Sequence, residues 1–366
     1  MDDSPKNFKK YGEIFEFLDI HGVHYTKMCK NWRNDPIIVI ERKGDVIVTA
    51  GSHGDEYGAV EAALKLSTEH ILFTFIPARD PSGINSFIDN LEFLVDSGKE
   101  VRDEEGIIQL IKNNSDWFFE DKDLGVFIGV FWDISVCYAK IRDEWAGEDD
   151  INERLQQILD KNEKVREKLE GMRVLIPSSL PKSEGVGMFD RTFTSFVYRG
   201  KVLNYNRIFH IQEESMPEEV LCIKRYIDEK KPKIVLDLHE GYGDKFYQFV
   251  PIPDDPMKLD LEVNLVKTLF DGVIKNGLEV LKVKEAKEIM KEERKFFFNN
   301  PDDYTVITIF DEEGKSLSTY ALAKLDSISS TLETGMRASL KKRIDMHKSA
   351  VIHLYENING LIRDAF

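Results

Sequence analysis

The chain has 366 residues, of which 42% are hydrophobic and 32% are charged, and its formal net charge at pH 7 is −16. This composition is typical of a globular protein, and the length is sufficient for one large α/β domain or two smaller ones. The acidic balance disfavours nucleic acid as a partner, because phosphates require a basic surface. No apolar run approaches membrane-spanning length and the first residues lack the pattern of a secretory signal, so we expect a cytoplasmic protein without a membrane partner.

Three cysteines, Cys29, Cys137 and Cys222, lie far apart in the sequence. Their number is odd and none of them belongs to a C-x-x-C pair, so neither a disulfide framework nor a cysteine-rich zinc site is indicated. We expect all three to be buried thiols.

The first part of the chain shows strand and helix patterns in the order β-β-α-β. The run PIIVIERKGDVIVTAG predicts two strands that are joined by a hairpin turn at Lys43 and Gly44. A helix is expected from about Glu56 to Glu69, followed by the strand ILFTFIP and a proline-containing turn.

From about residue 84 to residue 172 the chain becomes strongly charged and helical around one apolar run, GVFIGVFWDI. In the stretch DEWAGEDDINERLQQILDKNEKVREKLEG, apolar residues recur at helical spacing, so one face is expected to pack while the rest is solvated. We interpret this segment as a helical insertion over the main sheet. A partner-binding coiled coil is the alternative.

The rest of the chain alternates predicted strands with predicted helices. The strands are KIVLDLHEG, FYQFVPIP, TVITIF and SISSTLETG, and helices are expected over about 218–228, within 257–291, from about 317, and over about 338–364. This order predicts a single α/β domain over residues 1–366, with a mixed, largely parallel sheet that is covered by helices on both faces.

The stretch VIVTAGSHGDEYG, residues 46–58, carries the first chemical signal. Its apolar residues predict a buried strand that breaks at Gly51, which places His53 and Glu56 at the carboxyl end of a strand, where open α/β sheets bind ligands. An imidazole and a carboxylate three residues apart can both bind one Zn²⁺ ion. Taken alone, the pair is equally well explained as a loop histidine beside a carboxylate that complements a helix N-terminus. A second H-x-x-E pair, His353 and Glu356, has no strand before it and is interpreted as a solvated helix face.

Other predicted strands also end in polar residues. His239 ends the run KIVLDLHEG and would complete the three protein ligands of a catalytic zinc site. Glu333, in TLETG, is the expected general base, which takes a proton from a zinc-activated water and delivers it to the leaving amine. Arg199 and Arg207 are candidates to bind a substrate carboxylate or to stabilise an oxyanion.

In this order across residues 36–340, the motifs resemble those of the zinc carboxypeptidase superfamily, including its aspartoacylase and succinylglutamate desuccinylase branch. The matching elements are HGDE from His53, DPSG from Asp80, NRIF from Asn206, LDLHEG around His239 and TLETG around Glu333.

The resemblance implies a role for each matching residue. His53, Glu56 and His239 would bind zinc, Asn206 and Arg207 would bind the substrate carboxylate, and Glu333 would be the base. Arg199 would polarise the scissile carbonyl, with Arg191 as its rival. Asp237 lies on the same strand face as His239 and either supports that ligand or is a buried aspartate bonded to backbone amides. Glu240 points to the opposite face.

We therefore expect a zinc-dependent hydrolase that cleaves an amide bond next to a carboxylate. Its substrate would be a small peptide, as for a carboxypeptidase, or an N-acyl amino acid, as for a deacylase. The alternative from another class is a catalytically silent protein that binds a carboxylate ligand on the same fold. The complete set of ligands and base disfavours that alternative.

Overall fold

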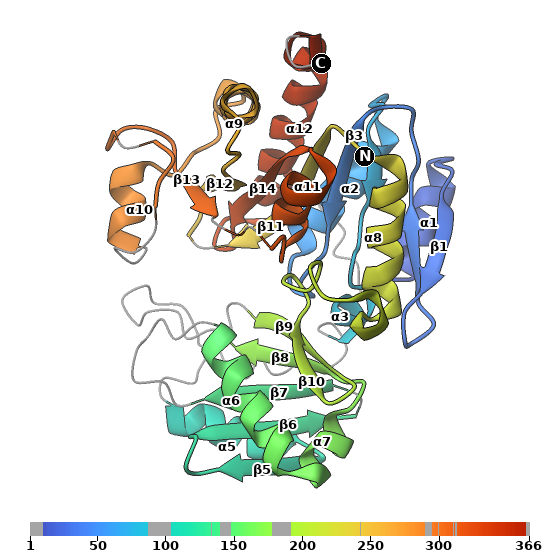
Figure 1. The fold of residues 1–366 in the computed structure, drawn as a ribbon, viewed down its shortest axis with the longest axis vertical. Coiled ribbons are helices and arrows are strands. Elements are labelled where there is room, and N and C mark those ends of the chain that lie inside the picture. The colour runs from blue at the N-terminus through green and yellow to red at the C-terminus, as the bar shows by residue number, and fades with distance from the viewer. Residues whose placement is uncertain are drawn as a thin grey trace.

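The computed structural model describes residues 10–86, 104–132, 134–139, 148–177, 192–241, 243–289, 295–298, 300–309, 311 and 313–363. Within these residues the chain builds two six-stranded sheets, which form the upper and lower parts of the molecule in Figure 1. None of the described helices is long and apolar enough to cross a membrane.

The main sheet has the strand order β13-β12-β14-β11-β3-β4. Its strands are β3 (Val46–Ala50), β4 (Thr74–Ile76), β11 (Ile234–Gly241), β12 (Phe246–Pro251), β13 (Val306–Ile309) and β14 (Ile328–Gly335). Four of them, β4, β3, β11 and β14, are parallel, whereas β12 pairs with β14 in the antiparallel sense and with β13 in the parallel sense. Every residue of β11 and β14 is buried, as expected for parallel strands that helices cover on both faces.

Helices pack on both faces of this sheet. They are α1 (Glu13–Ile20), α2 (Tyr57–Thr68), α8 (Glu218–Lys230), α9 (Pro256–Lys275), α10 (Val283–Ile289), α11 (Leu317–Leu325) and α12 (Leu340–Arg363). Leu236 and Leu238 of β11 share one hydrophobic cluster with α2, α9 and α12, whereas Val235 shares another with α8 and α11. The predicted fold class, a mixed and largely parallel sheet with helices on both faces, is therefore confirmed.

The predicted hairpin at Lys43 and Gly44 is wrong. Strand β2 (Pro36–Val39) pairs with β1 (Thr26–Lys30) in a separate two-stranded sheet, and the following Ile40 forms a bridge with Phe75 of β4. Strand β4 already occupies the free edge of β3, so β2 is displaced to the outside of β4. Strand order cannot be read from adjacency in the sequence when a crossover returns to fill the neighbouring position.

The segment after β4 forms the second sheet. It contains α3 (Pro81–Ser86), α5 (Glu104–Asn114), α6 (Glu148–Lys161) and α7 (Glu163–Leu169), with strands β5 (Trp117–Asp121), β6 (Val126–Phe131), β7 (Ile134–Ala139), β8 (Arg173–Pro177), β9 (Thr192–Tyr198) and β10 (Lys201–Asn204). The sheet order is β10-β9-β8-β7-β6-β5, and all neighbours are antiparallel except β7 and β8. We call the described residues between 104 and 204 the second lobe.

The helical insertion that we predicted over about 84–172 is thus an α/β segment. Only two residues separate β6 from β7, so the sequence shows one continuous apolar run where the structure has two paired strands. The charged helices are as expected, because Leu155, Ile158, Val165 and Leu169 are buried against the second sheet. Whether the whole chain behaves as one domain stays a prediction.

The expectation of three unpaired cysteines is wrong for two of them. Cys29 of β1 and Cys222 of α8 form a disulfide, with a Cα–Cα distance of 6.4 Å. Their separation of 193 residues gives no sequence signal, because only the tertiary contact of β1 with α8 brings them together. Cys137 is a free buried thiol, as predicted.

Candidate metal centre

The parallel register of the main sheet gathers polar residues on one face. In that register Asp237 is opposite both Thr49 and Thr331, and His239 is opposite Glu333. Residues at the same level of parallel strands share a face, and this face is the one that α8 and α11 cover. The site therefore begins at the carboxyl ends of β3, β11 and β14.

The loop after β3 brings two further groups to the same place. Gly51 has a φ of +64°, and a β-carbon there would lie 3.2 Å from the Cα of Ala78 and closer still to Val60, so only glycine fits this turn. After the turn, His53 precedes helix α2 and Glu56 is the residue at its N-cap. The positive end of the helix dipole favours a carboxylate at that position.

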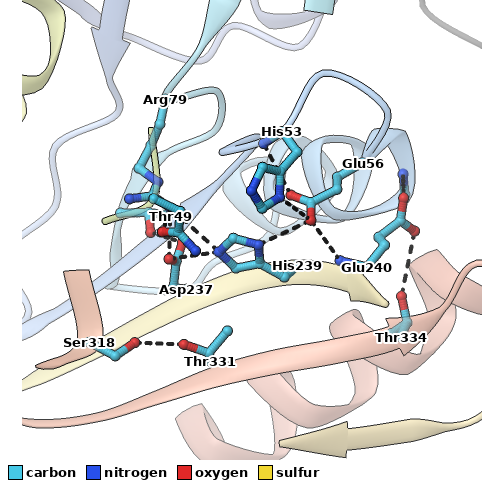
Figure 2. A network of polar contacts seen from close by, with 12 residues as sticks. Thr49, His53, Glu56, Arg79, Asp237, His239, Glu240, Ser318, Thr331 and Thr334 are labelled. Atoms are coloured by element: carbon cyan, nitrogen blue, oxygen red, sulfur yellow. Dashed lines mark hydrogen bonds and ion pairs between the residues drawn. The ribbon is translucent and has the colours of Figure 1, made fainter. Parts of the chain in front are cut away.

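His53, Glu56 and His239 form a compact buried group, whose ligand atoms all lie within 4.8 Å of one another. Figure 2 shows both imidazoles turned toward Glu56. The Nδ1 atoms of His53 and His239 lie 2.8 and 3.0 Å from the same carboxylate oxygen, Oε1 of Glu56. Two imidazole nitrogens and one carboxylate oxygen are the ligand set of many catalytic zinc sites. Within the described part of the chain, this is the one group of three or more such side chains with this spacing.

The second ring nitrogen of His239, Nε2, is hydrogen-bonded to a carboxylate. Its Nε2–H donates to Oδ2 of Asp237 over 2.9 Å, and Asp237 in turn accepts bonds from Thr49 at 2.6 Å and from Arg79 at 2.8 Å. A carboxylate at Nε2 fixes the tautomer that presents Nδ1 to a metal, which is how proteins orient metal-binding histidines. Asp237 therefore supports His239. The alternative interpretation predicted bonds to backbone amides, whereas Asp237 is bonded to side chains.

The charges of the group are suited to a cation. Burial alone would raise the pKa of the Glu56 carboxyl, but His239 and His53 hold it well below its ordinary value. Burial also acts to lower the pKa of His239, yet Glu56 and Asp237 outweigh this effect and raise it to about 10. The two carboxylates thus favour positive charge at His239. A metal ion at Nδ1 would replace one proton and keep the carboxylates neutralised. The residues present therefore fit a divalent zinc ion.

Glu333 is buried at the end of β14, beside His239 in the register. Its carboxylate reaches over Gly241, because a β-carbon at Gly241 would lie 2.6 Å from Oε2 of Glu333. The hydroxyl of the fully buried Tyr247 converges on the same point. The lack of a side chain at Gly241 thus makes the space that the Glu333 carboxylate occupies on the face of His239.

The other predicted site residues do not all contact this group. Asn206 is half-buried and its Oδ1 accepts a bond from Arg79, whereas Arg207 is exposed and its guanidinium bonds to the carbonyl of Asn206. Arg199 is exposed in the turn of the β9–β10 hairpin, where it contacts Glu214 and Tyr198. Within the described residues, Arg199 is therefore not found in contact with the candidate metal ligands. Arg191 lies outside the described residues.

Arg79 was missed in the sequence. It follows β4, the strand beside β3, so the rule that led to His53 applies to it as well. Glu240 points to the opposite face as predicted, where it accepts bonds from the Gly58 amide and from Arg343. Burial raises the pKa of Glu240 to about 7, although Arg343 acts to lower it.

No protein-family model matches this chain, and no curated protein matches it. Solved structures similar to it include metallo-carboxypeptidases. The enzyme from Pseudomonas aeruginosa, in complex with (2-guanidinoethylmercapto)succinic acid, is 8% identical with a TM-score of 0.49, and the match covers 98% of this chain and 70% of that one. Bovine thrombin-activatable fibrinolysis inhibitor, in complex with tick carboxypeptidase inhibitor, is 11% identical with a TM-score of 0.46 and 97% coverage of both chains. Carboxypeptidase A from Helicoverpa armigera is 13% identical with a TM-score of 0.45, over 97% of this chain and 73% of that one.

Proposed function

We propose that the protein is a zinc-dependent hydrolase that cleaves an amide bond next to a carboxylate, in a small peptide or in an N-acyl amino acid. The observation that carries the proposal is the convergence of the His53 and His239 Nδ1 atoms on one oxygen of Glu56, with Glu333 beside His239 in the sheet. Zinc bound there would supply a Lewis acid that polarises the scissile carbonyl and makes a water molecule more acidic.

The protein's own side chains would then perform the proton transfers. Glu333 takes the proton from the attacking water and delivers it to the nitrogen of the leaving amine, so one carboxylate serves as base and then as acid. Its burial near the end of β14, at the same level as His239, supports this role. Asp237 keeps His239 in the tautomer and orientation that binding requires.

Asn206 and Arg207 are proposed to bind the substrate carboxylate. Arg207 is exposed, so its guanidinium can leave the Asn206 carbonyl and turn toward a ligand. A guanidinium binds a carboxylate through two parallel hydrogen bonds that lysine cannot reproduce. Arg207→Lys should therefore raise KM for free-acid substrates. Amidation of the substrate should hurt the wild type more than this variant. Equal cleavage of free-acid and amidated forms by the wild type would contradict the role.

The test of the function is release of amine from a substrate panel by zinc-loaded protein. The panel contains peptides with free C-termini and N-acyl amino acids, because the same residues would serve both reactions. Chelator-treated protein and the His239→Ala variant are the controls. We expect turnover of at least one class, abolished in both controls. No turnover on any member, together with tight binding of a carboxylate ligand, would favour the silent binding protein instead.

A further inference from the structure

Arg79 contacts three residues of the site through one nitrogen atom. Its Nη2 lies 2.8 Å from Oδ2 of Asp237, 3.1 Å from Oδ1 of Asn206 and 3.4 Å from Nε2 of His239. These partners come from the middle of β11 and from the loop that follows the second lobe. In Figure 2 Arg79 reaches the Asp237 side of His239, opposite the side that faces Glu56. Arg79 therefore lies behind the candidate metal ligand, not beside the metal.

The backbone of Arg79 is held through both its amide and its carbonyl. Its amide donates to the carbonyl of Ala50 at the end of β3, and its carbonyl accepts a bond from the Tyr205 hydroxyl. The next residue, Asp80, accepts bonds from the guanidinium of Arg173 at 3.0–3.2 Å. Arg173 belongs to β8 of the second lobe, so the residue pair 79–80 is the junction between this lobe and the metal ligands.

Arg173 is itself fixed. It is fully buried, it donates to Glu219 at the start of α8 over 2.6 Å, and its guanidinium lies 4.1 Å from the ring centre of Phe196. A buried polar chain thus passes from the start of α8 through Arg173 of the second lobe to the candidate metal ligands, with Asp80 and Arg79 linked as neighbours in the sequence. Its members in order are Glu219, Arg173, Asp80, Arg79, Asp237, His239 and Glu56.

Stability alone is a poor explanation for the position of Arg79. It is 1% exposed, and its Nε and Nη1 have no hydrogen-bond partner among the described residues. Burying unsatisfied donors is unfavourable, and a buried ion pair often contributes no more stability than well-packed apolar side chains. The favourable contacts of Arg79 are those of Nη2 with Asp237 and Asn206, which link it to the site.

We propose that Arg79 is a positioning residue, which couples the loop that carries Asn206 to the metal ligand His239 through Asp237, and which Arg173 holds in place through Asp80. The inference rests on the metal site of the proposed function, but it does not require that the protein hydrolyse anything. It predicts that Arg79 affects metal binding without touching the metal.

The test is the affinity for zinc and cobalt of purified full-length variants, measured by competition with a chromophoric chelator. Arg79→Lys and Arg79→Ala should bind both metals about 10–100-fold more weakly, which is the usual effect of losing a group behind a metal ligand. The visible absorption of the cobalt-loaded protein should change, because the geometry of His239 changes. Added guanidinium ion should raise the metal affinity of Arg79→Ala part of the way back to the wild-type value. It should leave the metal affinity of the wild type unchanged.

Arg225→Lys is the matched control, because Arg225 pairs with Glu213 on an exposed surface. It should bind metal as the wild type does. Arg173→Lys should shift metal affinity in the same direction as Arg79→Lys. In the double variant Arg79→Lys/Asp237→Asn the losses should be less than additive, because both substitutions break the same contact.

Thermal unfolding of the metal-free proteins separates positioning from folding. The proposal is overturned if Arg79→Lys and Arg79→Ala unfold at lower temperature but retain wild-type metal affinity and the wild-type cobalt spectrum. A protein that binds zinc with these dependences but turns over no substrate would overturn the proposed function and leave this inference standing.

Discussion

Gly241 follows His239 by two residues, so both lie on the same face of β11. A β-carbon at Gly241 would lie 2.6 Å from Oε2 of Glu333 and closer still to the Tyr247 hydroxyl. Gly241→Ala should therefore push the Glu333 carboxylate away from its position. A displacement of about 1 Å can lower turnover about 100-fold, whereas zinc content should not change.

The control for this variant is Gly12→Ala, because a β-carbon at Gly12 would meet nothing within 4 Å and the residue has no positive φ. Steady-state kinetics and metal analysis of both variants check the prediction. If Gly241→Ala turned over substrate at the wild-type rate, the Glu333 carboxylate would not need the space above Gly241, and its role as the base would be in doubt.

Glu333→Gln tests the base directly. Glutamine keeps the size of the side chain but cannot take a proton, so turnover should fall by about 100-fold to 10,000-fold. Zinc content should stay at the wild-type level, because Glu333 is not one of the three ligands. A variant with a near wild-type rate would require another carboxylate as base.

At the level of single residues, the sequence indicated which side chains would lie together wherever a strand end could be recognised. His53, Glu56, His239 and Glu333 each follow or end an apolar run. The parallel register aligns His239 with Glu333, and the loop between β3 and α2 brings His53 and Glu56 to His239. Arg199 could not be placed in this way. Its distance from Asn206 in the sequence does not show that it lies in the turn of the β9–β10 hairpin, out of contact with the candidate metal ligands.

Among the elements, helix α9 contains a buried carboxyl group without a cationic partner among the described residues. Glu262 is fully buried and accepts a bond from the Ser329 amide of β14. Burial raises the pKa of Glu262 well above its ordinary value, although this hydrogen bond acts in the opposite direction. In the folded protein the group therefore stays protonated at a pH where the unfolded chain has ionised it.

This buried carboxyl group makes the stability of the protein fall as the pH rises. Between the ordinary pKa of 4.5 and the raised folded pKa, the folded state binds more protons than the unfolded chain. The contribution of Glu262 to stability therefore falls as the pH rises, by up to about 1.4 kcal/mol per pH unit. Glu262→Gln removes this dependence. Urea unfolding should show that its stability relative to the wild type improves from pH 5 to pH 8. An equal difference at both pH values would contradict the assignment.

Elements with a clear period were predictable. The helices α8, α9, α11 and α12 and the strands β11 and β14 lie close to their predicted positions. The strands of the second lobe were not predictable, because β6 and β7 merge into one apolar run and β5 is only partly buried. Pairing across a sheet is decided by tertiary contacts that local patterns do not contain.

In the molecule as a whole, the disulfide joins β1 to α8 across 193 residues. A cross-link over so long a loop restricts the unfolded chain, and its removal typically costs about 2–4 kcal/mol. Cys29→Ser should lower the unfolding free energy by about this amount, and a reductant should destabilise the wild type but not the variant. Disulfides persist mainly in oxidising compartments, which weighs against the predicted cytoplasmic location.

Thiol titration in denaturant checks the pairing. Of the three cysteines, Cys137 alone is free in the structure. One thiol should therefore react before reduction and all of them after it. Reaction of all the cysteines before reduction would show that Cys29 and Cys222 are not joined.

The central claim is that His53, Glu56 and His239 bind one metal ion. Elemental analysis of the purified protein measures this most directly, with the variants His53→Ala and His239→Ala beside the wild type. We predict about one equivalent of zinc per chain in the wild type and almost none in either variant, because two protein ligands do not complete a catalytic zinc site. Wild-type protein without stoichiometric metal after zinc loading, or full metal content in both variants, would contradict the account.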